Sequence, residues 1–327
     1  MPSFDSATDI LDLASAFRQS RVLLSAFDLG VFTVLGQGAA ASAVVAKAIP
    51  ADARATDRLL NALAAIGLVE KTDGLFANTP AAARWLDGAS PECLTSLGHA
   101  SHLFTAWAGL TGAVRAGTTV RDRKRDGFDT AAFIEAMDRR ARGIADALVA
   151  QIDLEGVERV LDVGGGSGAF AAAFCRARDG LVATVLDLPE VTQLTARYVA
   201  AAGFGGRVLL LPGDFHETPF GEGFDIVFFS AIVHMNGADA NRRLMAKAFA
   251  ALAPGGRIVI QDHIMDETRT RPADGALFAL NMLINTEAGD TYTENEMRGW
   301  LLDAGCQRVE QAGESPRIAL MIGHKVA

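Results

Sequence analysis

One glycine-rich turn constrains the fold of this 327-residue chain more than any other feature. An apolar run with one acid, VLDV at 160–163, leads into GGGSG at 164–168 and then into the helix-forming stretch 169–174. A buried strand, a tight turn and a helix start are typical of the first crossover of a nucleotide-binding α/β domain. Glycine can adopt positive φ and lets a ligand approach the backbone closely. The sequence therefore predicts a nucleotide-type ligand at this turn and leaves its identity open.

The composition is that of a globular protein with an acidic surface. Half of the residues are apolar, 21% are charged, and the net charge is −9. Such a chain repels nucleic acid and anionic membranes, so neither is an expected partner. No run of 18 apolar residues predicts a membrane span, and the length suggests two domains.

Three cysteines, Cys93, Cys175 and Cys306, lie far apart without the spacing of a zinc site or a redox pair. They are typical of small buried hydrophobic residues in a reducing compartment. The first residues lack the basic and apolar regions of a signal peptide. We therefore expect a cytoplasmic protein.

Residues 1–115 have the pattern of a mainly helical, winged-helix-like domain. Two short helices are predicted at 43–48 and 56–66, with Asp52 and Thr56 as candidate N-caps and Gly67 at the end. A β-hairpin is predicted over residues 68–77. Basic and acidic residues are equal in number between positions 40 and 80, so the charge needed for DNA binding is missing. The pattern favours a packing or dimerisation module.

The rest of the chain divides into a linking segment, 116–152, and an α/β domain, 153–327. The charged residues 120–127 predict a solvated loop, and a long helix is predicted from Phe128 to about Gln151. Strands are then predicted at 159–163, 183–188, 207–211, 225–229, 257–261, 307–311 and 318–322. The first five alternate with helices, as in a Rossmann-like, mostly parallel sheet, and the last two could form an antiparallel pair at one edge.

Polar residues after successive strands narrow the choice of ligand. Gly164, Gly166 and Ala169 also satisfy the dinucleotide pattern G-x-G-x-x-G/A, with Asp187 where a ribose-binding acid belongs. The glycine spacing behind Asp162 is tighter than the dinucleotide form. Further polar residues follow the third and fourth strands, namely Asp214, Ser230 and His234. The ends of parallel strands meet at one crevice, where open α/β sheets bind ligands.

Several motifs in the correct order resemble one enzyme family. They are LDVGGGSG at 161–168, LDLP at 186–189, GDF at 213–215 and LAPGGR at 252–257, together with AFDLGVF at 26–32, RLLNAL at 58–63 and GLV at 67–69. The chain thereby resembles the S-adenosylmethionine-dependent O-methyltransferases of the caffeic acid and acetylserotonin type. The resemblance implies a homodimer with a winged-helix dimerisation domain, a class I methyltransferase domain and S-adenosylhomocysteine as a product.

The resemblance also implies roles at the cofactor. Gly164, Gly166 and Gly168 would let the backbone approach the methionine moiety, and Asp187 would accept hydrogen bonds from the ribose. Asp214 and Phe215 would flank the adenine. The remaining residues expected at the cofactor are Asp162, Leu188, Ser230 and Met137.

His234 lies where the family has its catalytic histidine. A neutral imidazole, with an ordinary pKa of about 6.5, suits proton removal from a hydroxyl nucleophile. Met235-Asn236 stands where the family usually has Asp-Trp. Of two carboxylates that orient the histidine in plant members, one position falls on Asp262 and the other near Thr291. The orienting system is therefore expected to be partial, with Asp262 as its carboxylate.

An acceptor pocket is expected from apolar, aromatic and amide residues. They are His102, Trp107, Phe278, Asn281, Met282 and Asn285. Their character suggests a flat, partly apolar acceptor, and a phenolic hydroxyl fits best. His99 and His102 share a helix face, but packing is favoured there and no metal is expected. His263 is expected to point away from Asp262 and to play no direct role.

Other functions remain open from the sequence. The same fold could methylate sulfur, carbon or nitrogen. A nicotinamide oxidoreductase would need a proton donor such as Tyr-x-x-x-Lys, which neither Tyr198 nor Tyr292 supplies. A catalytically inactive, cofactor-binding dimer with a regulatory role is the alternative from another class.

Overall fold

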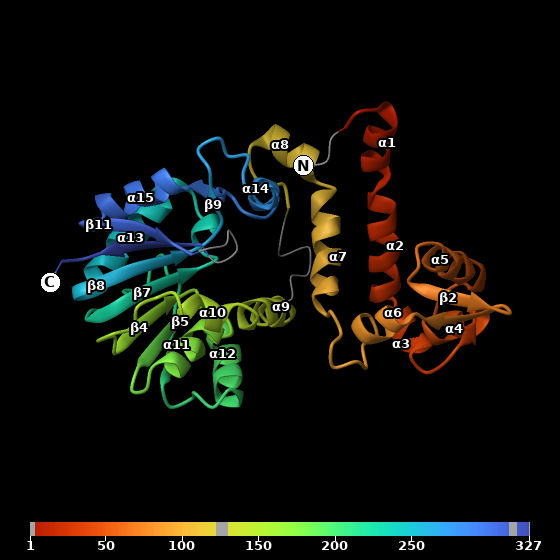
Figure 1. Cartoon of the computed structure of the whole chain (residues 1–327), viewed down its shortest axis with the longest axis horizontal. Helices are drawn as coiled ribbons and strands as arrows, with labels where there is room; N and C mark the ends of the chain where they lie inside the picture. Colours follow the sequence, from red (N-terminus) through yellow and green to blue (C-terminus); the bar gives the residue numbers. More distant parts are fainter. Residues whose placement is uncertain (1–3, 122–129, 314–318, 327) are drawn as a thin grey trace. The chain divides into compact units, whose positions relative to one another are not determined.

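The computed structural model describes residues 4–121, 130–313 and 319–326 of the chain. It contains two compact units, Met1–Thr105 and Ala106–Ala327 (Figure 1). Most of the predicted loop 120–127 and Phe128 lie outside the described residues. No helix in the described part of the chain is long and apolar enough to cross a membrane.

The first unit is mainly helical, with one small sheet. Its helices are α1 (Ala7–Ser15), α2 (Phe17–Asp28), α3 (Val31–Leu35), α4 (Ser42–Ala48), α5 (Ala53–Ala65), α6 (Pro80–Trp85) and α7 (Ser96–Trp107), which ends just inside the second unit. The strands β1 (Ala40–Ala41), β2 (Val69–Thr72) and β3 (Leu75–Asn78) form an antiparallel sheet in the order β1-β3-β2. Two helices followed by a hairpin give the winged-helix arrangement that the sequence predicts.

Local chemistry explains most of these boundaries. Asp52 caps α5, because its Oδ1 accepts a hydrogen bond from the Ala55 N–H at 2.8 Å. Thr56, the other predicted cap, lies inside α5 instead, and its buried hydroxyl donates to the Asp52 carbonyl at 2.9 Å. The hairpin turns at Asp73 and Gly74, whose φ angles of +50° and +81° match a tight two-residue turn.

The second unit contains a seven-stranded sheet covered by helices. The strands are β4 (Arg159–Val163), β5 (Val182–Asp187), β6 (Val208–Pro212), β7 (Phe224–Ser230), β8 (Leu252–Gln261), β11 (Arg308–Ala312) and β12 (Leu320–His324). The helices are α8 (Leu110–Ala116), α9 (Thr130–Arg142), α10 (Ala145–Val149), α11 (Ala169–Ala177), α12 (Pro189–Ala201), α13 (Ala238–Ala251), α14 (Ala273–Asn285) and α15 (Glu294–Asp303). Figure 1 shows α13 and α15 on one face of the sheet and α10, α11 and α12 on the other.

Strand order determines where a ligand can bind. The order is β11-β12-β8-β7-β4-β5-β6, with β4 to β8 parallel and β12 antiparallel to both neighbours. The seven predicted strands and the antiparallel edge pair are confirmed. From β4 the chain runs outward through β5 and β6, and then returns to β7 on the other side of β4. The carboxyl ends of β4 and β7 therefore flank a topological switch point.

The predicted long helix before the sheet is wrong in one respect. It is two helices, because α9 ends at Arg142 and α10 begins at Ala145. Gly143 lies between them, and the Ile144 N–H bonds the Ala141 carbonyl three residues back instead of continuing the helix. Glycine has a high conformational entropy in the unfolded chain and is a weak helix former, so the break falls there.

Candidate functional site

The glycine turn at the end of β4 is tightly packed on its inner side. Gly164, Gly166 and Gly168 have φ angles of +67°, +56° and +78°. A Cβ atom on Gly164 would lie 2.3 Å from Cδ1 of Ile232, and one on Gly168 would lie 2.7 Å from Cγ1 of Val199. At Gly166 the nearest atom would be Cδ1 of Ile134 at 3.8 Å. Gly166 therefore presents an open face at which a ligand can touch the backbone.

Two side chains hold the Gly166 residue from opposite ends. Oδ2 of Asp187 accepts from the Gly166 N–H at 2.8 Å, and Oδ1 accepts from the Leu188 N–H at 2.8 Å. The hydroxyl of Thr195 on α12 donates to the Gly166 carbonyl at 2.6 Å. Burial raises the pKa of Asp187, although these N–H donors oppose that shift. Each carboxylate oxygen can still accept a further hydrogen bond, so Asp187 can bind a ligand hydroxyl.

Asp162 lies beneath this turn. It is 1% exposed, and a Cβ on Gly165 would come within 2.6 Å of its Oδ2. Neither carboxylate oxygen has a hydrogen-bond partner in the described ranges. Burial, with the nearby charge of Asp187 as the second cause, raises the pKa of Asp162 to about 7.

The loop after β6 contributes an aromatic ring. The Phe215 ring lies beside the glycine turn, because its Cε1 is 3.7 Å from the Cβ position of Gly164. Lys247 on α13 donates to the Phe215 carbonyl at 2.9 Å and fixes this loop. Asp214 is exposed, and its Oδ1 accepts from the His216 N–H at 2.8 Å.

Two other predicted cofactor residues are placed less directly. The Ser230 hydroxyl donates to Oε1 of Gln261 at 2.7 Å, so it connects β7 to β8. Met137 is half-buried on α9, one turn after Ile134, the residue that approaches Gly166. The structure thus gathers Asp162, the glycines, Asp187, Leu188 and Phe215 around one turn.

A histidine–carboxylate pair follows β7 and β8. His234 lies in the 3-10 helix η1 (Val233–Met235), and its Nδ1 is 2.8 Å from Oδ1 of Asp262. The His234 backbone N–H also donates to Oδ2 of Asp262 at 3.2 Å. Burial alone would raise the pKa of Asp262, but its contacts with His234 and the His263 N–H lower that pKa below the ordinary value. Nε2 of His234 has no hydrogen-bond partner within the described residues.

Phe278 on α14 contacts two imidazole rings at once. Its ring meets His234 edge-on at 4.8 Å between centroids and lies against His263 at 4.4 Å. β8 ends at Gln261, so strand alternation does not orient His263, and its N–H donates to Asp262 at 2.8 Å. Burial lowers the pKa of His263. The sequence analysis assumed that the strand continues through His263, so it did not predict the contacts of this residue with Asp262 and Phe278.

A glycine loop packs against the backbone of His234. A Cβ on Gly289 would lie 2.4 Å from the His234 carbonyl oxygen, and the Asp290 N–H donates to that oxygen at 3.0 Å. The Tyr292 hydroxyl donates to the Asn236 carbonyl, and burial raises the pKa of Tyr292 to about 12. Thr291 is buried but has no contact with the His234 ring among the described interactions. Sequence reasoning missed Gly289 and Tyr292.

Three of the predicted acceptor residues form a hydrogen-bonded group. Nε1 of Trp107 donates to Oδ1 of Asn281 at 3.3 Å, and Nδ2 of Asn285 donates to the Asn281 carbonyl at 2.9 Å. Arg121 donates to Oδ1 of Asn285 at 2.9 Å. Met282 is buried, and His102 is an exposed residue of the first unit.

No group of three or more His, Cys, Asp or Glu side chains that could hold a metal ion is found in the part of the chain that the structure describes.

Comparison with known families gives a match to each unit. The O-methyltransferase dimerisation domain matches residues 11–88, and the O-methyltransferase domain matches residues 106–307. The 3-hydroxy-5-methyl-1-naphthoate 3-O-methyltransferase of Streptomyces sahachiroi is 34% identical over 94% of this chain and 92% of its own length.

Solved structures agree with these matches. PigF with S-adenosylhomocysteine superposes with a TM-score of 0.89 at 25% identity and covers 98% of this chain and 100% of its own. Human N-acetylserotonin methyltransferase in complex with S-adenosylmethionine gives a TM-score of 0.82 at 25% identity over the whole of both chains.

Proposed function

This chain belongs to the S-adenosylmethionine-dependent O-methyltransferase family, and we propose that it methylates a phenolic hydroxyl of a small aromatic molecule. The methyl donor is S-adenosylmethionine, and S-adenosylhomocysteine is the second product. When bound, the donor supplies a methyl group on a sulfonium, which is already a good leaving group. The protein must align the hydroxyl, exclude water and take up its proton.

The glycine turn fits this donor. The open face of Gly166 admits the backbone contact, and the Asp162 side chain lies directly beneath the turn. We assign the ribose to Asp187 beside Leu188 and the adenine to Phe215 and Asp214. Met137 and Ser230 complete the proposed walls, with Ser230 acting through its bond to Gln261.

The hydrogen bond between His234 and Asp262 supports a proton-accepting role for His234. The ionised carboxylate at 2.8 Å from Nδ1 favours the tautomer with the proton on Nδ1, so Nε2 keeps its lone pair. Nε2 is also the ring atom without a partner among the described residues. His234 is therefore proposed as the base, and Asp262 as the residue that positions it and stabilises its charged form.

The acceptor is proposed to lie near α14. Phe278 offers an aromatic wall beside His234, and Trp107, Asn281 and Asn285 offer polar groups with defined orientations. Met282 is assigned to packing behind this wall, and His102 stays a predicted acceptor residue. The relative that acts on a hydroxylated naphthoate supports an aromatic acceptor.

We propose that the chain forms a homodimer through its first unit. The dimerisation domain match covers α2 to α6, and α1 and α2 expose Leu11, Leu13 and Phe17. Exposed apolar residues on adjacent helices favour association with a second copy. The three buried thiols support a cytoplasmic location.

The proposal is tested by incubating the purified protein with S-adenosylmethionine and matched panels of phenols, aryl thiols and aryl amines. Mass spectrometry should detect products heavier by one CH₂ among the phenols, and NMR should place the methyl group on oxygen. Methylation confined to thiols, amines or ring carbon would overturn the phenolic assignment.

A further inference from the structure

The loop between β9 and α14 begins beside the segment that packs against His234. Strand β9 (Ile264–Met265) pairs in parallel with β10 (Tyr292–Thr293). Just before β10, the Asp290 N–H donates to the His234 carbonyl at 3.0 Å, and the Tyr292 hydroxyl donates to the backbone two residues beyond His234. The segment 290–292 therefore holds the backbone around His234 at two points, and any group that fixes this segment also fixes the histidine.

The loop after β9 is closed on itself and carries one arginine in an unusual conformation. Oδ1 of Asp266 accepts hydrogen bonds from the backbone N–H groups of Thr270 and Arg271 at 3.1 and 3.2 Å. Arg269, inside this closed loop, has a φ angle of +57°, which is uncommon for a residue other than glycine. Such a conformation persists where the surrounding contacts require it, so the contacts of the Arg269 side chain indicate its role.

The Arg269 guanidinium contacts the segment 290–292 and the start of α15 together. Its Nη1 donates to the Thr291 carbonyl at 2.9 Å and to Oδ2 of Asp290 at 3.3 Å. Its Nη2 donates to Oε1 of Glu296 at 2.6 Å. Oε2 of the same glutamate accepts from the Thr293 N–H at 2.8 Å and caps α15. A planar guanidinium directs its N–H groups in fixed directions, so these bonds set the position of the segment.

We propose that Arg269 is a positioning residue for methyl transfer, which fixes His234 against Asp262 through the segment 290–292. This inference rests on the proposed function, because it concerns the base assigned there. The Arg269 and Asp290 side chains are 44% and 45% exposed. Exposed ion pairs contribute little to the stability of a fold, so loss of Arg269 should leave the protein folded and act on the geometry of the histidine.

Proton NMR tests this role without an acceptor. The Nδ1 proton of His234 lies in a buried hydrogen bond to a carboxylate, which predicts a resonance far downfield that is absent from His234→Ala. In Arg269→Gln we expect this resonance to shift or disappear, because the histidine is displaced. Arg298→Gln is the matched control and should keep the resonance. Arg298 also donates to a carbonyl and to a carboxylate on α15, but its partners, Val309 and Glu294, lie outside the segment 290–292.

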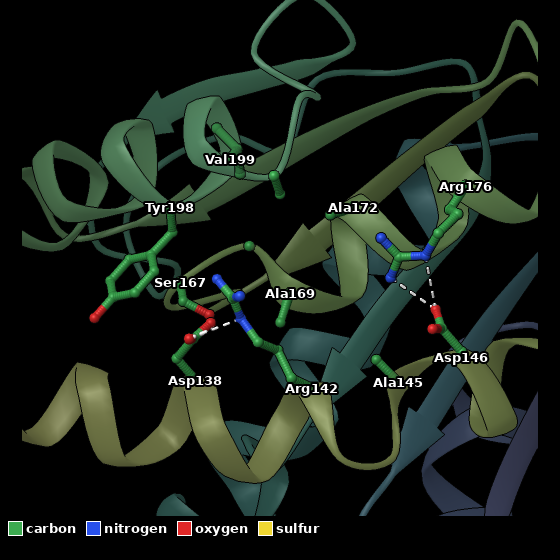
Figure 2. A pocket seen from close by; sticks show the side chains of 12 residues that line it. Asp138, Arg142, Ala145, Asp146, Ser167, Ala169, Ala172, Arg176, Tyr198 and Val199 are labelled. Atoms are coloured by element: carbon green, nitrogen blue, oxygen red, sulfur yellow. Dashed lines mark hydrogen bonds and ion pairs between the residues drawn. The ribbon is translucent and has the colours of Figure 1, made fainter. Parts of the chain in front are cut away.

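A second control removes an exposed arginine on the opposite face of the sheet from α15. Figure 2 shows Arg176 of α11 with two hydrogen bonds to Asp146 of α10, at 3.1 and 2.7 Å. Arg176→Gln should keep the His234 resonance and the Kd of S-adenosylhomocysteine. The two controls thus separate the effect of the segment 290–292 from the general effect of losing an arginine.

Turnover gives a second measurement, with a phenol that the panel above identifies as an acceptor. In Arg269→Gln we expect kcat to fall about tenfold, since small displacements of a catalytic group are costly. The KM of the phenol and the Kd of S-adenosylhomocysteine should stay unchanged. Arg269→Lys should recover part of kcat, because lysine keeps the charge but not the planar fork.

An unchanged His234 resonance in Arg269→Gln would overturn the assignment, whatever happens to kcat. Equal losses in Arg269→Gln and Arg298→Gln would overturn it as well. A wild type that methylates no phenol would instead refute the proposed function, and the NMR comparison would still show whether Arg269 fixes His234.

Discussion

Nδ1 of His234 and Oδ1 of Asp262 are 2.8 Å apart, although 28 positions separate the residues in the sequence. One follows β7 and the other follows β8, and these strands are parallel neighbours. The parallel sheet therefore brings both residues to the same edge, and their contact involves no second carboxylate at the Thr291 position.

Replacement of His234 by alanine should abolish most turnover and leave the donor site intact. We expect kcat to fall about 10²- to 10⁴-fold, the usual contribution of a general base. The Kd of S-adenosylhomocysteine should not change, because His234 is not part of the glycine turn. His324→Ala, on the far strand β12, serves as the control and should keep full activity. Equal turnover in wild type and His234→Ala would show that alignment alone drives the transfer.

Thr195→Val should weaken donor binding through the Gly166 carbonyl. The substitution keeps the shape of the side chain but removes the 2.6 Å hydrogen bond to the turn. Without this bond the turn can move away from the geometry at which the donor contacts its backbone, so the Kd of S-adenosylhomocysteine should rise about tenfold, which corresponds to the roughly 1.4 kcal/mol of one hydrogen bond. Thr195→Ser should restore it.

Thr192→Val is the matched control on the same helix. Its hydroxyl donates to the Pro189 carbonyl at 3.0 Å and does not touch the turn. If both valine variants weakened binding to the same extent, the effect would come from α12 in general and not from Gly166.

Gly289→Ala should lower turnover without affecting the donor. Its Cβ would lie 2.4 Å from the backbone oxygen of His234, so the loop that carries the histidine must shift. We expect kcat to fall at least about tenfold, since small displacements of a catalytic group are costly. Gly299→Ala on α15 meets no atom within 4 Å and should leave kcat unchanged. A normal kcat in Gly289→Ala would contradict the supporting role of this loop.

The buried Asp162 should make the ligand-free protein less stable as the pH rises. Its pKa is about 7 in the folded state and about 3.8 in the unfolded chain, so the folded state binds the extra proton between these values. Its contribution to the free energy of unfolding then falls by about 1.4 kcal/mol per pH unit across that range.

Urea unfolding at pH 5 and pH 8 tests whether the free energy of unfolding falls as the pH rises. Asp162→Asn should lose less stability between the two pH values than the wild type does. Asp239→Asn, which replaces an exposed carboxylate on α13, should follow the wild type. Identical pH dependence in all three proteins would show that Asp162 is ionised throughout.

The sequence predicts the parts of this fold that depend on local pattern. The glycine turn and the seven strands follow from residue pattern and spacing, and the pairing of His234 with Asp262 follows from the resemblance to the family. Other features depend on packing between distant segments. The placement of Gly289 against His234, the double contact of Phe278 and the contacts of Arg269 with the segment 290–292 have no signature in any short stretch. The helix break at Gly143 could have been predicted from the sequence, because glycine destabilises the interior of a helix.

The topological switch point between β4 and β7 separates the residues assigned to the methyl donor from those assigned to proton removal and the acceptor, so each set lies in its own stretch of the sequence. The groups assigned to the donor lie mostly between residues 159 and 215, and those assigned to proton removal and the acceptor lie mostly between 230 and 292. We therefore expect substitutions in the later stretch to alter which molecule is methylated and to leave binding of the methyl donor unchanged. Chimeras that exchange α14 and its flanking loops are the natural route to redirecting this enzyme.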